Sequence, residues 1–224
     1  MSEPAPDSLV EEPAGRIVVA AFDVDGTLTQ RDCVAPFLLR LGGRRGVVFA
    51  VVRRPFATLR GALRRDRDRL KEVVVGGVFR NRSVDEVAAA GREFALHVEA
   101  TCLRPDTLER LRWHQQMGHR TVLVSASLRP YLDPLARSLA VEHVLCTDVV
   151  SDSGRYTRVL KGPNCRAGEK VARLHALLAM HGMDDIELWA YGDSAGDREL
   201  LDRADHAVWV KGSTLPAVPA GFER

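Results

Sequence analysis

The chain has 224 residues, 46% of them hydrophobic and 28% charged, which suits one globular core with a modest insertion. Its formal net charge of +2 is too close to balance to indicate a nucleic-acid partner, and we predict none. Four cysteines stand far apart without a Cys-x-x-Cys pair, and neither a signal peptide nor a membrane-length apolar run is present, which predicts a cytoplasmic protein with reduced thiols. Residues 1–15 carry prolines, acids and small side chains, so we expect a disordered leader there.

The first predicted strand covers residues 17–22, a short apolar run rich in β-branched side chains. Asp23 and Asp25 follow it with one residue between them, and Gly26 comes next. On a strand or its extension this spacing points both carboxylates the same way, and two acids aimed at one point favour a bound cation or a shared proton. The alternative is a strand that ends in an ordinary Asp-Gly hairpin turn. The acids found later in the chain favour the bound cation or shared proton over the hairpin turn.

The segment from residue 32 to residue 104 is predicted to be a helical insertion. Apolar residues recur at helical spacing over residues 33–41 and 84–101, and no alternating strand pattern appears between them. Residues 44–71 contain ten basic residues against two acidic ones. Gly76-Gly77 and residues 81–83 are predicted breaks, and Ser83 with Glu86 forms a plausible capping box for the next helix.

Helices and strands then alternate to the end of the chain. Helices are predicted at 105–117, 128–139, 166–181 and 194–203, strands at 120–125, 141–150, 186–191 and 206–210, and a small hairpin with its turn at 152–154. Such alternation predicts an α/β fold with a doubly wound, mainly parallel sheet and helices on both faces. Asp23, Ser125 and Asp193 each follow a predicted strand, so we expect them to converge at the carboxyl edge of the sheet.

A second pair of acids, Asp193 and Asp197, lies in a predicted turn that starts a helix. Their spacing of four residues puts both carboxylates on one side of such a turn. Helix capping by Asp193 or Ser194 is the simpler interpretation, but it explains neither the second acid nor Gly192.

Two lysines, Lys161 and Lys170, are candidates for a cationic role near these acids. A lysine at a helix start opposes the helix dipole, which favours Lys170 as a functional residue, with a solvated surface lysine as the alternative.

Residues 22–29, Phe-Asp-Val-Asp-Gly-Thr-Leu-Thr, resemble the first motif, DxDGT, of the haloacid dehalogenase-like (HAD) superfamily. Residues 192–197 resemble its fourth motif, GDxxxD, and Ser125 stands at the position of its second motif. Lys170 looks like the third-motif lysine of the phosphoserine-phosphatase-like branch, subfamily IB. The resemblance implies a HAD Rossmann-like core over residues 16–31 and 105–224, with a helical type 1 cap over residues 32–104.

For the site, the resemblance implies a magnesium-dependent phosphatase that acts through an aspartyl-phosphate. The implied catalytic residues are Asp23 as nucleophile, Asp25 as acid and base, and Lys170 as a cation. The implied metal ligands for Mg²⁺ are Asp23, the backbone carbonyl of Asp25, and Asp193, supported by Asp197. Ser125 and the backbone at Ala126 are expected to hold the phosphate, and Asp32 stands where phosphoserine phosphatases carry a glutamate for the substrate amine. No counterpart of their cap arginine can be singled out among so many arginines.

The expected substrate is a small phosphomonoester such as phosphoserine, or a lipid phosphate. The alternatives are a catalytically silent HAD-like binding or regulatory module and a phosphorylated receiver domain, although a receiver needs no helical insertion. For the basic stretch within residues 44–71, two interpretations stay open: a solvated helical face that packs its apolar side on the core, or a surface that meets an anionic membrane.

Overall fold

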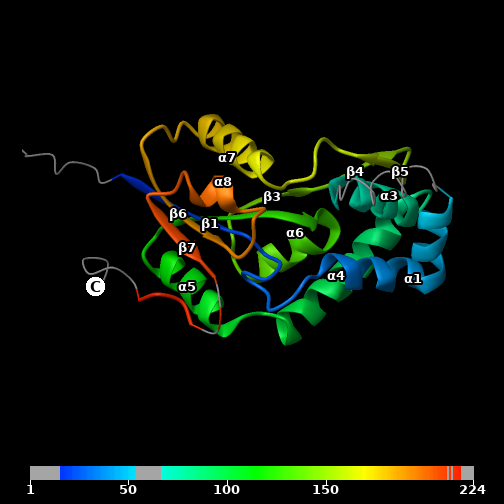
Figure 1. The fold of residues 1–224 in the computed structure, drawn as a ribbon, viewed down its shortest axis with the longest axis horizontal. Helices are drawn as coiled ribbons and strands as arrows, with labels where there is room; N and C mark the ends of the chain where they lie inside the picture. The colour runs from blue at the N-terminus through cyan, green and yellow to red at the C-terminus, as the bar shows by residue number, and fades with distance from the viewer. Residues whose placement is uncertain (1–15, 54–66, 211, 213, 218–224) are drawn as a thin grey trace, which may run out of the picture.

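The protein is built around a parallel sheet. The computed structural model describes residues 16–53, 67–210, 212 and 214–217. Within these residues a five-stranded sheet has the order β3-β2-β1-β6-β7, with every neighbouring pair parallel (Figure 1). Its strands are β1 (Ile17–Phe22), β2 (Arg120–Leu128), β3 (His143–Thr147), β6 (Ile186–Gly192) and β7 (His206–Trp209). The predicted leader, residues 1–15, lies outside the described residues.

Alternate side chains of β1 serve two separate hydrophobic clusters, as expected for a strand buried on both faces. Ala20 and Phe22 pack with α5 (Pro105–Gln116) and α6 (Arg129–Ser138). Val19 and Ala21 pack with α7 (Gly168–Met180) and the short α8 (Arg198–Leu201). Figure 1 shows α7 and α8 on one side of the sheet and α5 on the other. The predicted doubly wound α/β fold is therefore confirmed.

Of the described helices between β1 and β2, three fall in the segment of residues 32–104. They are α1 (Val34–Val52), which changes direction at Gly43, α3 (Arg67–Phe79) and α4 (Val84–Thr101). They lie together at one end of the molecule, beside the predicted hairpin of β4 (Val149–Asp152) and β5 (Arg155–Leu160) (Figure 1). Residues 54–66 of the predicted basic stretch lie outside the described residues.

The prediction that Gly76 and Gly77 break a helix is wrong, because both lie inside α3. A Cβ atom added to Gly76 would stand 2.3 Å from the backbone oxygen of Arg158, and one on Gly77 would stand 2.3 Å from the Cβ atom of Ala50. The two glycines therefore let β5 and α1 approach the helix closely, which offsets their weak helix propensity. The real break is Asn81, with a φ of 63°.

Other boundaries agree with the sequence patterns in most places. The α4 helix begins as predicted, since the Ser83 hydroxyl accepts a hydrogen bond of 3.1 Å from the backbone N–H of Glu86. The Glu86 carboxylate does not close the predicted box and instead binds Arg82. β2 continues past its predicted end at Ser125 to Leu128, with an irregularity in its pairing to β3.

The four cysteines are free and buried. None of the described helices combines the length and apolar composition needed to cross a lipid bilayer.

Candidate active site

The carboxyl edge of the sheet collects polar side chains from three strands. Asp23 follows β1, Ser125 lies near the end of β2, and Asp193 follows β6. The backbone N–H of Asp23 donates to the carbonyl of Tyr191 at 2.9 Å, so pairing between β1 and β6 continues up to the acid. The predicted convergence of these residues thus follows from the parallel pairing of their strands.

Three carboxylates form the centre of this edge. One oxygen from each of Asp23, Asp193 and Asp197 lies within 4.8 Å of the others. Burial, together with the other two acids, raises the pKa of Asp193 to about 6, and burial also raises the pKa of Asp23. A Cβ atom on Gly26 would stand 2.4 Å from Oδ2 of Asp193, so only glycine leaves room for this carboxylate. Asp23 and Asp197 are buried and Asp193 is half-buried, so the charged state of these neighbouring acids is unfavourable unless positive charge is nearby.

The acid cluster is suitable for a hard divalent cation. Oδ1 of Asp193 is buried and has no hydrogen-bond partner within the described chain, which leaves one carboxylate oxygen unsatisfied. Carboxylate oxygens are the ligands that Mg²⁺ prefers in proteins. A bound divalent cation would offset the repulsion among the three acids and satisfy this oxygen.

Asp197 is held more firmly than Asp193. Its Oδ2 accepts hydrogen bonds from the backbone N–H and the hydroxyl of Ser194, at 3.0 and 2.9 Å. Residues 194–197 form a closed turn, and for this reason α8 starts at Arg198, later than the predicted start at Ser194. These contacts are compatible with the predicted roles of Asp193 as a metal ligand and of Asp197 as its support.

Lys170 lies between two of the acids. Its Nζ donates to Oδ1 of Asp23 and to Oδ1 of Asp197, each at 2.5 Å. Burial alone would lower the pKa of Lys170, but the two negative charges outweigh it and the pKa is raised. Lys161, the competing candidate, is exposed and outside the cluster.

The start of α7 holds Lys170 in place. Lys170 is the third residue of this helix, and its side chain is only 2% exposed. Ala167, just before the helix, has a φ of 54°, a conformation that costs energy in a residue other than glycine. Its backbone N–H donates to the carbonyl of Gly196 at 2.8 Å, which ties the helix start to the turn that carries Asp197.

Asp25 lies in a separate environment from the acid cluster. Its Oδ2 accepts a hydrogen bond of 2.7 Å from the Ser127 hydroxyl, and its Oδ1 accepts one of 2.9 Å from the backbone N–H of Cys33. Burial raises the pKa of Asp25 to about 7, against the effect of the Ser127 hydrogen bond. A carboxyl group with such a pKa can both give and take a proton near neutral pH. Ser127 was not predicted, although its spacing of two from Ser125 within a strand places both on one side.

The carboxyl end of β2 meets a helix of the inserted segment. The backbone N–H of Ser127 donates to the Ser125 hydroxyl at 3.1 Å, and the carbonyl of Ala126 accepts a hydrogen bond from Lys71 of α3. Lys71 also donates to Oδ1 of Asn164 at 2.8 Å. Burial lowers the pKa of Lys71 to about 8. Lys71 was not predicted, because no sequence signal separates it from the other basic residues of residues 44–71.

Asp32 is exposed at the start of α1. Its Oδ2 accepts a hydrogen bond of 3.1 Å from the backbone N–H of Ala35, so it caps the helix. Its predicted contact with a substrate amine stays a prediction, as does the predicted role of the Asp25 carbonyl as a metal ligand.

Comparison with known proteins identifies the family. The family model described as haloacid dehalogenase-like hydrolase matches residues 20–202. The chain belongs to this family. Protein CicA of Caulobacter vibrioides is 35% identical over 91% of this chain and 89% of its own length. Phosphoserine phosphatase SerB2 of Mycobacterium tuberculosis is 27% identical over 84% of this chain, which corresponds to 42% of SerB2.

Solved structures agree with this placement. A protein of unknown function from Bordetella pertussis has a TM-score of 0.69 at 28% identity, covering 84% of this chain and 87% of its own. A substrate-bound phosphoserine phosphatase has a TM-score of 0.58 at 14% identity, covering 85% and 84%, a likeness of fold alone. The predicted family, with its phosphatase class and its phosphoserine-phosphatase-like branch, is confirmed.

Proposed function

We propose that this HAD phosphatase hydrolyses phosphomonoesters through an aspartyl-phosphate on Asp23 and requires Mg²⁺. The observation that carries the proposal is the acid cluster of Asp23, Asp193 and Asp197 beside a separately held Asp25 with a pKa of about 7. Asp23, the Asp25 carbonyl and Asp193 are the proposed metal ligands. Bound there, Mg²⁺ supplies positive charge that offsets the charge of a phosphate dianion.

In the proposed reaction Asp23 is the nucleophile and Asp25 transfers the protons. The Asp23 carboxylate attacks phosphorus, and the bond from phosphorus to the leaving-group oxygen breaks. Asp25, whose pKa of about 7 leaves it partly protonated near neutral pH, gives its proton to that oxygen, and then takes one from the water that hydrolyses the aspartyl-phosphate. Lys170 holds Asp23 and Asp197 in position, and Ser125 with the backbone N–H of Ala126 is proposed to hold phosphate oxygens.

The proposed substrates are phosphoserine, a similar small phosphorylated metabolite, or a lipid phosphate. The name of the relative SerB2 supports the first, and Asp32 offers a carboxylate for an amine. The helical segment of residues 32–104 is proposed to act as a cap that excludes bulk water and selects the leaving group. Lys71 supports this, because its hydrogen bond joins α3 to the end of β2 at Ala126.

Two further proposals concern membrane contact and the cellular compartment. Contact of the cap with anionic membrane is supported by the exposed apolar residues Val48, Phe49 and Val52 on α1, close in sequence to Arg44 and Arg45. The other interpretation, a solvated helical face, predicts no binding to anionic vesicles at low salt. Cytoplasmic localisation is supported by the free cysteines.

The test of the proposed function uses p-nitrophenyl phosphate with Mg²⁺ and the variant Asp23→Asn. We expect the wild type to turn over and to form an acid-stable phosphoenzyme from labelled substrate, whereas the variant does neither and keeps its fold. Asp184→Asn, an exposed change of the same kind, is the control. A wild type that binds substrate without turnover would support the alternative of a silent binding module. Turnover retained in Asp23→Asn would reject Asp23 as nucleophile.

A further inference from the structure

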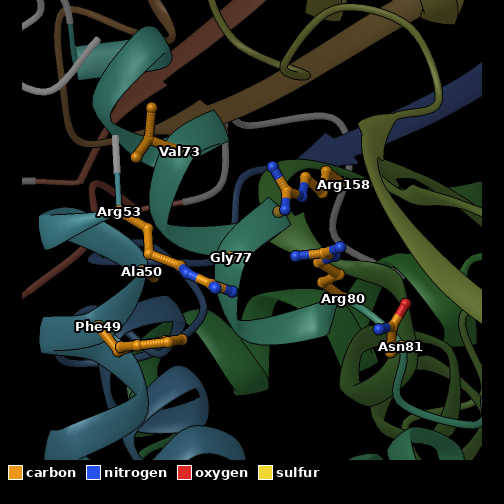
Figure 2. Close-up of a pocket in the computed structure, with 9 residues that line it drawn as sticks. Phe49, Ala50, Arg53, Val73, Gly77, Arg80, Asn81 and Arg158 are labelled. Atoms are coloured by element: carbon orange, nitrogen blue, oxygen red, sulfur yellow. The ribbon is translucent and has the colours of Figure 1, made fainter. Parts of the chain in front are cut away.

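A pocket lined by arginines lies between the inserted helical segment and β5. Between α1, α3 and β5 the described residues enclose a pocket of about 190 Å³ (Figure 2). Arg53, Arg80 and Arg158 line it, and none of the described residues that line it is acidic. We call it the arginine pocket and define it by these three arginines with Phe49, Ala50 and Val73.

The arginine pocket is distinct from the acid cluster. The lining positions 73, 76, 77 and 80 recur at helical spacing, so they lie on one face of α3 and at its end. Lys71 points from the opposite face of the helix to the carbonyl of Ala126, at the active-site end of β2. A ligand in the arginine pocket would therefore be separated from the acids by the width of α3.

The pocket concentrates positive charge. Its three arginines come from separate elements, and Figure 2 shows their nitrogen ends directed toward the same space. Within the described chain no carboxylate pairs with Arg53 or Arg80, and the Arg53 guanidinium lies 4.6 Å from the centroid of the Phe49 ring. Arg53 and Arg80 carry like charges at one pocket, and a bound anion relieves the repulsion between them.

Apolar side chains form the rest of the wall. Phe49, which is 57% exposed, lies at the pocket with Ala50 and Val73. The close approach at Gly76 fixes the β5 backbone against α3 and so brings Arg158 next to this wall. The site therefore offers both charged donors and an apolar surface, the combination found in small-molecule sites.

We propose that the arginine pocket binds the phosphate group of a small molecule whose remaining part is apolar. Arginine forks from three directions suit the several oxygens of a phosphate better than the two of a carboxylate. The volume is below the roughly 300 Å³ at which pockets for drug-sized ligands begin, so the apolar part inside is short. A soluble organic phosphate and the headgroup of a phospholipid share this chemistry.

Binding is tested by following the side-chain Nε–Hε NMR signals of Arg53, Arg80 and Arg158 in the full chain. The probes are hexylphosphonate, which cannot be hydrolysed as an ester, and inorganic phosphate. We expect saturable shifts of all three signals, with tighter binding of hexylphosphonate. These signals come from the arginine pocket itself. Binding of either probe at the acid cluster would therefore not produce the same shifts. Failure of the proposed catalytic function would leave this measurement unaffected.

Matched variants give the decisive comparison. Arg80→Ala should weaken hexylphosphonate binding about tenfold or more, since it removes a charge-assisted hydrogen bond. Arg112→Ala, at an exposed arginine of α5, should leave it unchanged. Sedimentation with phosphatidate-containing vesicles distinguishes a lipid headgroup from a soluble organic phosphate as the ligand. Vesicle binding that Arg80→Ala abolishes points to a lipid headgroup. If the protein binds hexylphosphonate but not the vesicles, the ligand is a soluble one. No saturable shift at the three arginines, or equal weakening by both variants, would overturn the proposal.

Discussion

Replacing Lys170 by methionine should destabilise the protein strongly. The side chain is 2% exposed, and its two partners, Asp23 and Asp197, have side chains 8% and 2% exposed. Methionine fills a similar volume but leaves two buried carboxylates without their cation. Removing one partner of a buried ion pair typically lowers the free energy of unfolding by about 3–5 kcal/mol, whereas an exposed pair contributes about 0–1 kcal/mol. Because Lys170 and both of its partners are buried, the larger range applies. In EDTA we therefore expect Lys170→Met to lower the free energy of unfolding by about 3–5 kcal/mol.

The assay is urea denaturation followed by tryptophan fluorescence, in EDTA and in Mg²⁺. Lys161→Met is the matched control, since Lys161 is exposed and should change the free energy of unfolding by no more than about 0.5 kcal/mol. Added Mg²⁺ should restore part of the loss in Lys170→Met, because a cation bound by the folded state stabilises it by mass action. A loss below about 1 kcal/mol would refute the reasoning, because it would mean that water screens these charges. Activity should fall further in Lys170→Ala than in Lys161→Ala.

Three other predictions concern single side chains. Asp193→Asn should raise the Mg²⁺ concentration needed for half-maximal activity at least about tenfold, as measured by metal titration, with Asp184→Asn unchanged. Asp25→Asn should lower kcat about 10²–10⁴-fold in steady-state assays while the melting temperature stays close to that of the wild type; an unchanged kcat would contradict its role as acid and base. Burial, with the positive charges around it, lowers the pKa of His114 to about 2, so the unfolded chain binds a proton below pH 6.5 that the folded chain does not. His114 should therefore lower the free energy of unfolding by about 1.4 kcal/mol for each pH unit below 6.5, and denaturation of His114→Phe should lack this part of the slope.

The sequence predicts the sheet well because its strands are apolar runs with clear ends. Residues 17–22 are both the predicted strand and β1, and the α4 helix occupies the predicted residues 84–101. Asp23 and Asp193 could be placed together without a structure, because parallel strands end at the same edge.

Contacts made between distant segments could not be predicted in the same way. Gly76 and Gly77 favour a break by local propensity, and only the neighbouring β5 and α1 explain their place inside a helix. Lys71 has the same local pattern as its basic neighbours, so its contact with Ala126 depends on how α3 docks. Lys170 could be predicted near the acids, but its simultaneous bonds to Asp23 and Asp197 required the geometry of the turn.

The position of β1 in the sheet has a consequence for how the chain folds. β1 is near the beginning of the chain but central in the sheet, and its residue Val19 pairs with Arg120 while Ile17 pairs with Ile186. During synthesis, the strand that carries Asp23 cannot acquire its neighbours until long stretches have left the ribosome, whereas α1, α3 and α4 can form from local contacts. Loop-closure entropy opposes such distant pairing, which slows folding relative to a helical bundle of equal size. We therefore expect the protection of β1 amides from hydrogen exchange to appear late in refolding, after that of α4.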